Sequence, residues 1–459
     1  MNNHQPAWEH ELTTREDEHL AEFLDFIRIP SVSALPEHHA DVERAAEWVA
    51  ARMRRAGIPE VEIISTENKP LVWGRWHVAD DQPTALIYAH YDVQPPDPLE
   101  LWETPPFEPA IRDGRIYARG PADDKGGVLS TILAVEALAR AHGQPPINVL
   151  FFYEGEEEIG SPAVPKVIAA DRARFACDLV LSADGLMAGP DLPCLGVGSK
   201  GLAGCQIDIR TGRTDLHSGI YGATVPNALQ ILIQLAATMH TPDGRVAVEG
   251  FYDAVRALTP EERREIADYP FDDANFKEEA GVSAYWGEEG YSPLERMWTR
   301  PTLDFNGVWG GFQGAGSKTV TPCEAHAKIT CRLVPNQSPA DVVQLIARHV
   351  AKHCPAGVAA TVTPLPGRAN PFSIRRDHPG LLAAGKVLEE MYGRPPVIER
   401  SGGTVPVAEI FQRELGADFI FFGFSLPGCQ IHAPNEWFRV EDLHRGAKAY
   451  CALLTELAR

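Results

Sequence analysis

The sequence feature that most constrains the fold is a series of apolar stretches, each ending in acidic or histidine side chains. Residues 84–92 read TALIYAHYD, residues 147–158 read INVLFFYEGEEE, and residues 178–184 read DLVLSAD. Nearly continuous apolar runs of this length, alternating with helical patterns, indicate strands buried on both faces of a largely parallel sheet. Ligands of such sheets bind beyond the carboxyl ends of the strands. The polar side chains that end these runs are therefore expected to meet at one edge.

Helical patterns surround these strands. Residues 16–29 place Leu20, Phe23, Leu24 and Ile27 on one face, and residues 41–57 end in basic residues and a glycine, which is a helix stop signal. Further helical or α/β patterns cover 125–141, 405–424 and 441–458. The sequence therefore predicts an α/β domain with a mainly parallel sheet and helices on both of its faces.

The middle of the chain has a different pattern. Residues 205–213 (CQIDIRTGR) and 324–334 (EAHAKITCRLV) alternate apolar and polar side chains, as half-exposed antiparallel strands do. This change indicates a second, α+β domain inserted into the first, while residues 244–300 receive no assignment. The expected organisation is a first domain formed by residues 1–205 and 383–459, interrupted by the insertion at 206–382.

Composition limits the classes of partner. The 459 residues carry a formal net charge of −21, which argues against nucleic acid or an anionic membrane surface as a partner. No apolar run approaches the ~20 residues of a membrane span, and the first residues lack the apolar core of a secretory signal. The eight cysteines contain no C-x-x-C pair. These features predict a cytoplasmic protein with reduced thiols.

A cluster of carboxylates follows the strand that ends near residue 154. Glu154, Glu156, Glu157 and Glu158 lie within five positions, and such a cluster repels itself unless a positive charge neutralises it. Imidazoles and carboxylates that suit zinc or manganese occur at the other strand-to-loop transitions. These candidate ligands are His90, Asp92, Asp123, Asp124, Asp184 and His432.

Each of these motifs alone has an ordinary structural explanation. An Asp before a Gly-rich turn is often a helix cap, and a run of Glu is often a solvated helix start. Their occurrence together, each at a strand-to-loop transition, favours a metal site. His90 and Asp92 are two residues apart and face the same way in an extended chain, so Asp92 can orient His90 from behind while His90 binds metal.

At these residues the sequence resembles the family-20 metallopeptidases, which include acetylornithine deacetylase, succinyl-diaminopimelate desuccinylase, carboxypeptidase G and carnosinase-type dipeptidases. The resemblance covers nearly the whole chain and is greatest to the cytosolic dipeptidase branch. It is carried by the segments YAHYDVQP, ARGPADDKGG, EGEEEIGSP, LSADG, DLHSGIYGATVPN, GSKTVTP, RLVPNQSP, GGTVPV and IHAPNE.

The resemblance implies two divalent metal ions per subunit, with Zn²⁺ expected and Mn²⁺ as the alternative. His90 and Asp184 would hold one ion, Glu158 and His432 the other, and Asp123 would bridge both. In relatives the peptide bond after the bridging Asp is often cis. The catalytic residues implied are Asp92 behind His90, Glu157 as general base and acid, and His217.

The resemblance implies that residues 1–205 and 383–459 form the catalytic, metal-binding domain and that the insertion is a lid and dimerisation domain. In a homodimer, His217 of the insertion would reach into the partner's active site and stabilise the oxyanion. The substrate, chiefly its C-terminal carboxylate, would be held by Thr319, Arg332, His378, Gly403 and Thr404. Position 404 carries Thr where carnosinase-type relatives have Ser, which keeps the hydroxyl and adds a methyl group.

The expected function is hydrolysis of the amide bond of dipeptides or short peptides with a free C-terminal carboxylate. A water activated by metal would attack the bond with Glu157 as general base. An N-acyl-amino-acid deacylase or a carboxypeptidase of the same family is the alternative, since both use the same site. The alternative that is not an enzyme is a peptide-binding protein on the same scaffold, which would lack the general base or a metal ligand.

Overall fold

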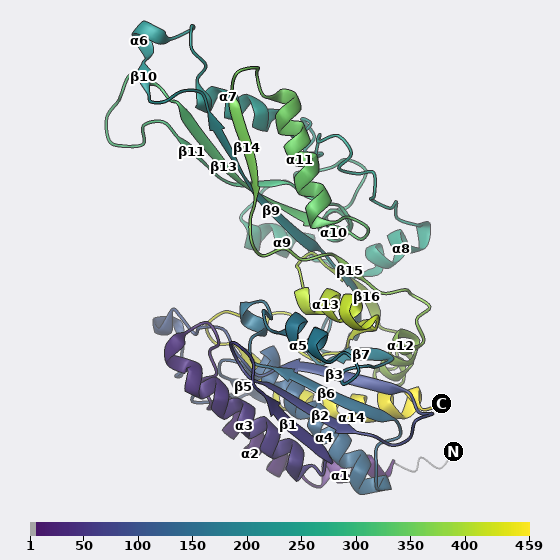
Figure 1. Cartoon of the computed structure of the whole chain (residues 1–459). Helices are drawn as coiled ribbons and strands as arrows, with labels where there is room; N and C mark the ends of the chain where they lie inside the picture. The colour runs from purple at the N-terminus through teal and green to yellow at the C-terminus, as the bar shows by residue number, and fades with distance from the viewer. Residues whose placement is uncertain (1–5) are drawn as a thin grey trace. The chain divides into compact units, whose positions relative to one another are not determined.

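The computed structural model describes residues 6–459, which form two compact units (Figure 1). The first unit comprises the chain up to Val197, together with Ile374–Glu399 and Ile410–Arg459. The second unit comprises Gly198–Ser373 and Arg400–Glu409. Residues 206–382, predicted as the insertion, overlap the Gly198–Ser373 segment of the second unit, and Arg400–Glu409 adds a further segment that was not predicted.

A large sheet forms the centre of the first unit. Its strand order is β1-β2-β6-β3-β7-β17-β8-β15, and β16 also pairs with β8. The pairings β6–β3, β3–β7 and β7–β17 are parallel, whereas the strands toward both edges pair antiparallel. The strands are β1 (Glu60–Ile64), β2 (Leu71–Trp76), β3 (Thr84–His90), β6 (Asn148–Glu154), β7 (Leu179–Ser182), β8 (Cys194–Ser199), β15 (Phe372–Ser373), β16 (Val397–Ser401) and β17 (Asp418–Phe421).

Helices cover both faces of this sheet, as the contacts of adjacent residues on β6 show. Phe152 packs edge-on against Phe411 of α13 (Pro406–Leu415), with ring centroids 5.1 Å apart. The next residue, Tyr153, points to the other face, where its hydroxyl lies 2.7 Å from that of Thr131 on α4 (Gly126–His142). The predicted α/β class with helices on both faces is therefore confirmed.

Helices α2, α3, α4 and α14 of the first unit lie close to the predicted ranges, whereas α1, α5 and α12 were not predicted. Helix α4 is apolar nearly all round because α1 and α14 pack against the side that does not face the sheet. A small sheet of order β18-β5-β4 lies apart from the large one. These elements are α1 (Ala7–Thr13), α2 (Glu16–Ile27), α3 (His39–Arg55), α5 (Val164–Ala170), α12 (Pro379–Tyr392), α14 (Val440–Leu457), β4 (Ala110–Arg112), β5 (Arg115–Tyr117) and β18 (Trp437–Arg439).

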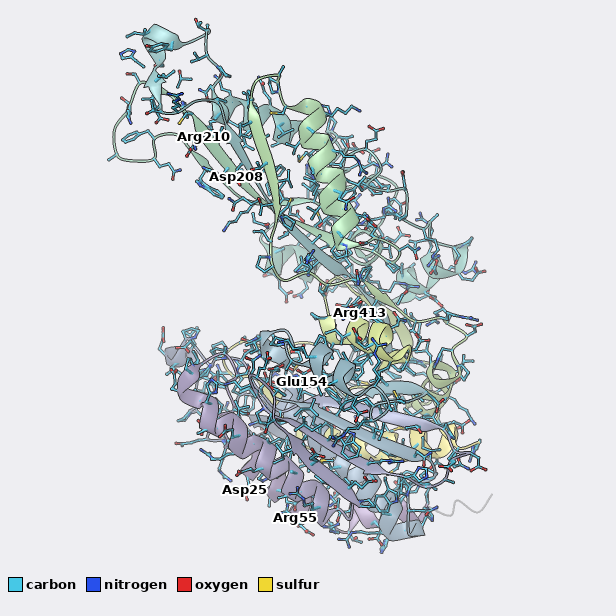
Figure 2. All side chains as sticks on the ribbon, in the orientation of Figure 1. Asp25, Arg55, Glu154, Asp208, Arg210 and Arg413 are labelled. Atoms are coloured by element: carbon cyan, nitrogen blue, oxygen red, sulfur yellow. The ribbon has the colours of Figure 1, made fainter. Side chains whose placement is uncertain are left out.

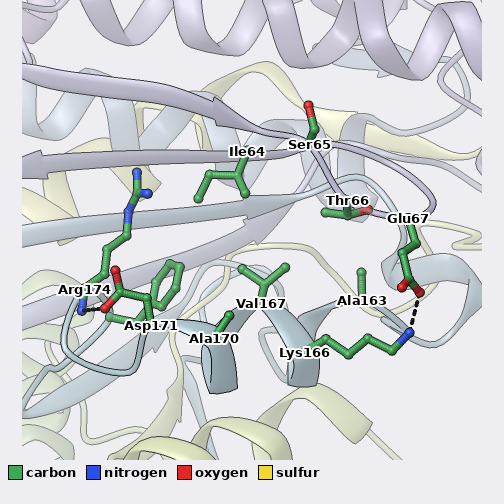
Figure 3. Close-up of a pocket in the computed structure, with 11 residues that line it drawn as sticks. Ile64, Ser65, Thr66, Glu67, Ala163, Lys166, Val167, Ala170, Asp171 and Arg174 are labelled. Carbon is green, nitrogen blue, oxygen red and sulfur yellow. Dashed lines mark hydrogen bonds and ion pairs between the residues drawn. The ribbon is translucent and has the colours of Figure 1, made fainter.

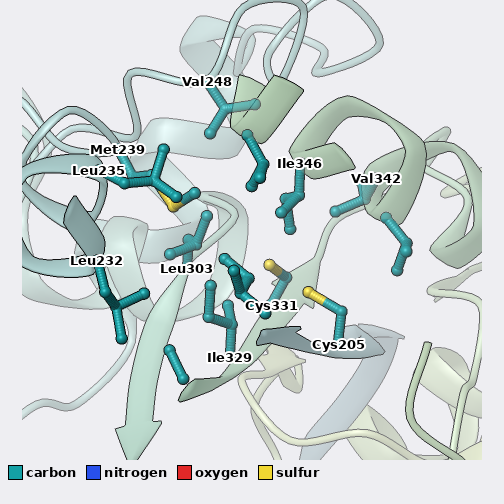
Figure 4. Packing of buried hydrophobic residues seen from close by; sticks show 14 of the residues in the cluster. Cys205, Leu232, Leu235, Met239, Val248, Leu303, Ile329, Cys331, Val342 and Ile346 are labelled. Atoms are coloured by element: carbon teal, nitrogen blue, oxygen red, sulfur yellow. The ribbon is translucent and has the colours of Figure 1, made fainter. Parts of the chain in front are cut away.

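The second unit is built on an antiparallel sheet of order β11-β13-β9-β14. Alternate side chains of β9 and β13 form a core with α7 and α11, in which Ile329 and Cys331 pack near Leu232 and Ile346 (Figure 4). The other side chains, such as Asp208 and Arg210 (Figure 2), are partly or fully exposed. The elements are β9 (Gly201–Arg210), β11 (Asp304–Gly310), β13 (Glu324–Leu333), β14 (Ala359–Pro364), α7 (Ala228–Ala237) and α11 (Pro339–His353).

Residues 244–300, which had no assignment, contain three short helices. These are α8 (Pro260–Asp268), α9 (Asp273–Ala280) and α10 (Pro293–Thr299). Thr259 and Ser292 begin α8 and α10 with capping boxes, and the T-P-E-E and S-P-L-E sequences are the signals that could have located both helices. Ile266, Leu294 and Trp298 form a small apolar cluster between them.

No helix within residues 6–459 combines the length and the apolar character needed to cross a lipid bilayer.

Candidate active site

The carboxyl ends of three parallel strands bring the predicted metal ligands together in the first unit. His90 is the last residue of β3 and lies opposite Glu154, the last residue of β6. Asp184 follows β7, which is paired in register with β3. Glu158 lies in the short helical turn Glu157–Ile159 after β6, and two loops bring in Asp123 and His432.

These residues form two groups that share Asp123. The possible ligand atoms of His90, Asp123 and Asp184 lie within 4.8 Å of one another, as do those of Asp123, Glu158 and His432. Asp123 Oδ1 lies 2.8 Å from His90 Nε2, and Asp123 Oδ2 lies 2.9 Å from His432 Nε2. The distance from His432 Nε2 to Glu158 Oε2 is 3.1 Å. Each Asp123 oxygen therefore belongs to a different group, so one carboxylate can contact two cations.

Asp92 contacts residues of both candidate metal groups. Its Oδ1 lies 3.4 Å from His90 Nδ1, and the Asp92 carbonyl oxygen lies 3.1 Å from the same atom. The backbone N–H groups of Glu157 and Glu158 donate to the two Asp92 oxygens at 3.2 and 3.1 Å. Because His90 Nδ1 faces these acceptors, its Nε2 is the ring atom left for a ligand role.

The acidic cluster that follows β6 divides in two. Glu154 accepts hydrogen bonds from Tyr88 (2.7 Å) and Ser161 (2.9 Å), and Glu156 accepts one from the backbone N–H of Ala163. Burial raises the pKa of Glu154 to about 8, so it is largely protonated at neutral pH and needs no counter-charge. Only Glu157 and Glu158 then remain to interact with the groups around Asp123.

The charges of the site act strongly on one another. Burial raises the pKa of Glu157 well above its ordinary value, and the nearby negative charges of Asp184, Asp123 and Glu158 raise it further. Burial and the Asp123 charge raise the pKa of Asp184 to about 6. Hydrogen bonds to Asp123 and Glu158 raise the pKa of His432 to about 10. Such crowding of like charges in a buried setting is typical of functional sites.

One buried carboxylate that supports the site was missed by the sequence analysis. Glu436 is fully buried and accepts backbone N–H groups from Gly120 (2.9 Å), Ala122 (3.0 Å) and Asp123 (3.3 Å). Its Oε2 also lies 2.7 Å from Arg119 Nη1. Glu436 therefore fixes the loop that carries Asp123, in which the Asp123–Asp124 peptide bond is cis, as the resemblance implies. Its place in the segment IHAPNE was visible, but its burial was not.

The predicted substrate residues of the second unit lie in two places. Arg332 Nη1 donates to Thr404 Oγ1 at 2.6 Å, and Gly403 precedes Thr404 in the same turn. His217 and Thr319 line a separate cavity of about 580 Å³. The segment with His217 pairs with Val320–Thr321, next to the Glu324 end of β13, whereas Arg332 lies near the other end of that strand.

The structure places His378 away from the metal-ligand candidates of the first unit. Its Nδ1 accepts the backbone N–H of Gly380 at 3.2 Å and caps α12, and its Nε2 lies 3.7 Å from Asp418 Oδ2. Asp418 begins β17, which runs parallel to β7, so His378 lies at the amino ends of the strands. The metal-ligand candidates lie at their carboxyl ends. A substrate-binding role for His378 stays a prediction.

A different hollow in the first unit, about 480 Å³ in volume, lies beside α5 (Figure 3). Ile64, Val167 and Ala170 contribute apolar surface to it, and Lys166 forms an ion pair with Glu67 at its rim. None of the predicted site residues lines this hollow, so it does not belong to the candidate active site.

Comparison with known protein families identifies the family of the chain. Residues 86–456 match the peptidase family M20/M25/M40. The chain belongs to this family.

The similarity to three known proteins extends over most of this chain and most of each of those proteins. The Cys-Gly metallodipeptidase dug1 of Schizosaccharomyces pombe is 29% identical over 97% of this chain and 96% of that protein. The Beta-Ala-His dipeptidase of Homo sapiens is 28% identical over 82% of this chain and 75% of its own. The solved structure of the M20 family metallo-carboxypeptidase Sso-CP2 from Sulfolobus solfataricus has a TM-score of 0.80, with 32% identity over 96% of this chain and 99% of that chain.

Proposed function

We propose that this protein is a metallodipeptidase that hydrolyses the amide bond of dipeptides with a free C-terminal carboxylate. The observation that carries the proposal is Asp123, whose two oxygens face His90 and His432 in two separate groups. The similarity to Cys-Gly and Beta-Ala-His dipeptidases over most of the chain supports the same reaction.

The residues present fit a pair of divalent ions. His90, Asp123 and Asp184 offer one nitrogen and two carboxylates, and Asp123, Glu158 and His432 offer the same set. This mixture of donors suits Zn²⁺, with Mn²⁺ as the alternative. Two such ions supply Lewis acidity and lower the pKa of a bound water.

Glu157 is the proposed general base. Its backbone N–H is held by Asp92, and its carboxyl lies among the charges of Asp184, Asp123 and Glu158, which would hold the ions. Its raised pKa suits a group that accepts a proton from water and then delivers it to the leaving amine. Arg332 and Thr404, joined by their hydrogen bond, hold the C-terminal carboxylate of the substrate.

His217 and Thr319 are proposed to act in the active site of a partner subunit. The His217 segment lies next to Glu324, at the start of β13. Arg332 comes eight positions later on the same strand, which corresponds to about 27 Å of extended chain. A dipeptide spans only about 7 Å. His217 of one chain therefore cannot contact a dipeptide held by Arg332 of the same chain, which supports a homodimer in which each subunit completes the other's site.

Mixing two inactive variants tests the shared site. His217→Ala lacks the oxyanion donor and Glu157→Ala lacks the base, so a mixed dimer of the two contains one site with both residues intact. Partial recovery of activity after subunit exchange, up to about a quarter of the parental rate for random pairing of equal amounts, is expected. A mixture that exchanges subunits, as shown by mass spectrometry of mixed dimers, and stays inactive would contradict the shared site.

A carboxypeptidase activity on longer peptides is the second candidate, because Sso-CP2 is a metallo-carboxypeptidase. A substrate panel distinguishes the two, with Cys-Gly and β-Ala-His against tripeptides, N-acetyl and N-succinyl amino acids. The proposal predicts hydrolysis of a dipeptide that is lost with a chelator and restored by Zn²⁺ or Mn²⁺. Preference for tripeptides indicates the carboxypeptidase, and preference for N-acyl amino acids indicates a deacylase.

A further inference from the structure

Lys200 is a buried cation of the second unit that the mechanism above does not use. It lies in the turn between β8 and β9, and only 3% of its surface is exposed. Its ammonium group donates to the carbonyl oxygen of Arg296 at 3.1 Å. That carbonyl belongs to the last turn of α10, where helix carbonyls carry partial negative charge.

The backbone of Lys200 holds the turn that contains Thr404. Its N–H donates to the carbonyl oxygens of Ser401 (3.2 Å) and Gly403 (2.9 Å), and Gly403 N–H donates to Ser401 Oγ at 3.0 Å. Arg332 contacts the same turn through Thr404. Lys200, in the turn before β9, and Arg332, on β13, therefore contact the same short segment, and Leu202 of β9 pairs with Arg332.

The charges near Lys200 are not balanced. Arg300, the buried cation nearby, forms a two-pronged ion pair with Glu288 at 2.8 and 2.9 Å. Within residues 6–459, no carboxylate forms an ion pair with Lys200 or with Arg332. Burial, together with the Arg332 and Arg300 charges and against the Asp304 charge, lowers the pKa of Lys200 to about 8. Two neighbouring cations without a carboxylate partner are suited to an anion brought by a ligand.

We propose that Lys200 is the second cation of the carboxylate-binding site, where it acts together with Arg332 on the C-terminal carboxylate of the dipeptide. The inference rests on the proposed dipeptidase function. Arg332 and Thr404 supply directional hydrogen bonds, while Lys200 supplies charge and fixes the Ser401–Thr404 turn. The site then selects peptides with a free carboxylate over their amides.

The residues offer matched variants for a binding test. Lys200→Met removes the ammonium group but leaves the backbone N–H that holds the turn. Lys328→Met removes the same charge from an exposed position on β13, where Lys328 lies 5.9 Å from the Trp309 ring. Both are made in the metal-loaded Glu157→Gln protein, which allows binding to be measured by calorimetry without turnover. The probes are Ala-Gly and Ala-Gly amide.

Lys200→Met is expected to weaken Ala-Gly binding about tenfold at pH 7 and to leave Ala-Gly amide binding unchanged. Lys328→Met is expected to change neither. With Lys200 present, Ala-Gly binding weakens as the pH rises past 8, and Lys200→Arg moves this loss to higher pH.

Equal weakening of both probes by Lys200→Met would show a purely structural role and overturn the inference, as would unchanged binding of Ala-Gly. Failure of the Lys200-containing protein to bind Ala-Gly would contradict both proposals. Lys200-dependent binding of Ala-Gly, together with no hydrolysis of any dipeptide by the metal-loaded parent, would contradict the dipeptidase proposal alone.

Discussion

Asp92 Oδ1 accepts the backbone N–H of Glu157 at 3.2 Å, and this hydrogen bond links the proposed general base to the residue that lies behind His90. The same oxygen lies 3.4 Å from His90 Nδ1. One buried carboxylate therefore orients an imidazole and fixes the turn that carries Glu157 and Glu158. The distance between the candidate ligands His90 and Glu158 thus depends on a residue that belongs to neither candidate metal group but contacts a member of each.

Asp92→Ala is expected to weaken metal binding about 10- to 100-fold, because partners behind a ligating histidine contribute by that amount. The affinity is measured by competition with a chromogenic chelator. Asp25→Ala, at an exposed carboxylate of α2 paired with Arg28, is the matched control and should bind metal as the parent does. Unchanged affinity in the Asp92 variant would show that His90 needs no support from it.

Glu157→Gln is expected to keep its full metal content and to lose about 10³-fold or more in kcat, because it removes the general base and leaves the ligand set intact. Metal content is measured by mass spectrometry of the purified protein, and kcat on the best dipeptide of the panel. Loss of metal from this variant would mean that Glu157 is a ligand and that the base lies elsewhere.

Glu436→Ala is expected to destabilise the first unit by about 3–5 kcal/mol, because it leaves Arg119 buried without its partner and frees three backbone donors. Urea unfolding measures the loss. Glu441→Ala, at a half-exposed carboxylate paired with Arg439, should cost about 1 kcal/mol or less. Similar losses for the two variants would contradict the role given to Glu436.

Acid should destabilise the protein through His19. This imidazole is buried, and its Nδ1 lies 3.3 Å from His444 Nε2. Burial, and then the charges of His444 and Arg15, lower the pKa of His19 to about 4 from an ordinary value of 6.5. A group whose folded-state pKa is depressed contributes stability above its unfolded pKa, and this contribution is lost as the pH falls from 6.5 toward 4. His19→Gln should flatten the fall in melting temperature over this window; an unchanged slope would exclude His19 as its source.

The sequence predicted which strand-end side chains lie together, because buried parallel strands have a clear apolar pattern and their carboxyl ends share one edge. The position of Asp92 behind His90 could also be predicted, because the two-residue spacing fixes the direction of its side chain. The roles of Glu436 and Lys200 depend on burial and on contacts between distant segments, which leave no periodic signal. The capping role of His378 was not visible for a related reason: a histidine before a helix serves as a cap as readily as a ligand, and only the contacts of the folded chain show the cap.

The most direct test is the number of metal ions bound per chain. Protein freed of metal, then dialysed against Zn²⁺ or Mn²⁺ and analysed by mass spectrometry, should contain two ions per subunit. Asp123→Asn should retain at most one, because it weakens both groups, and Asp184→Ala should retain one. An Asp123→Asn variant that still binds two ions per subunit would contradict the account, as would dipeptide hydrolysis by a metal-free protein.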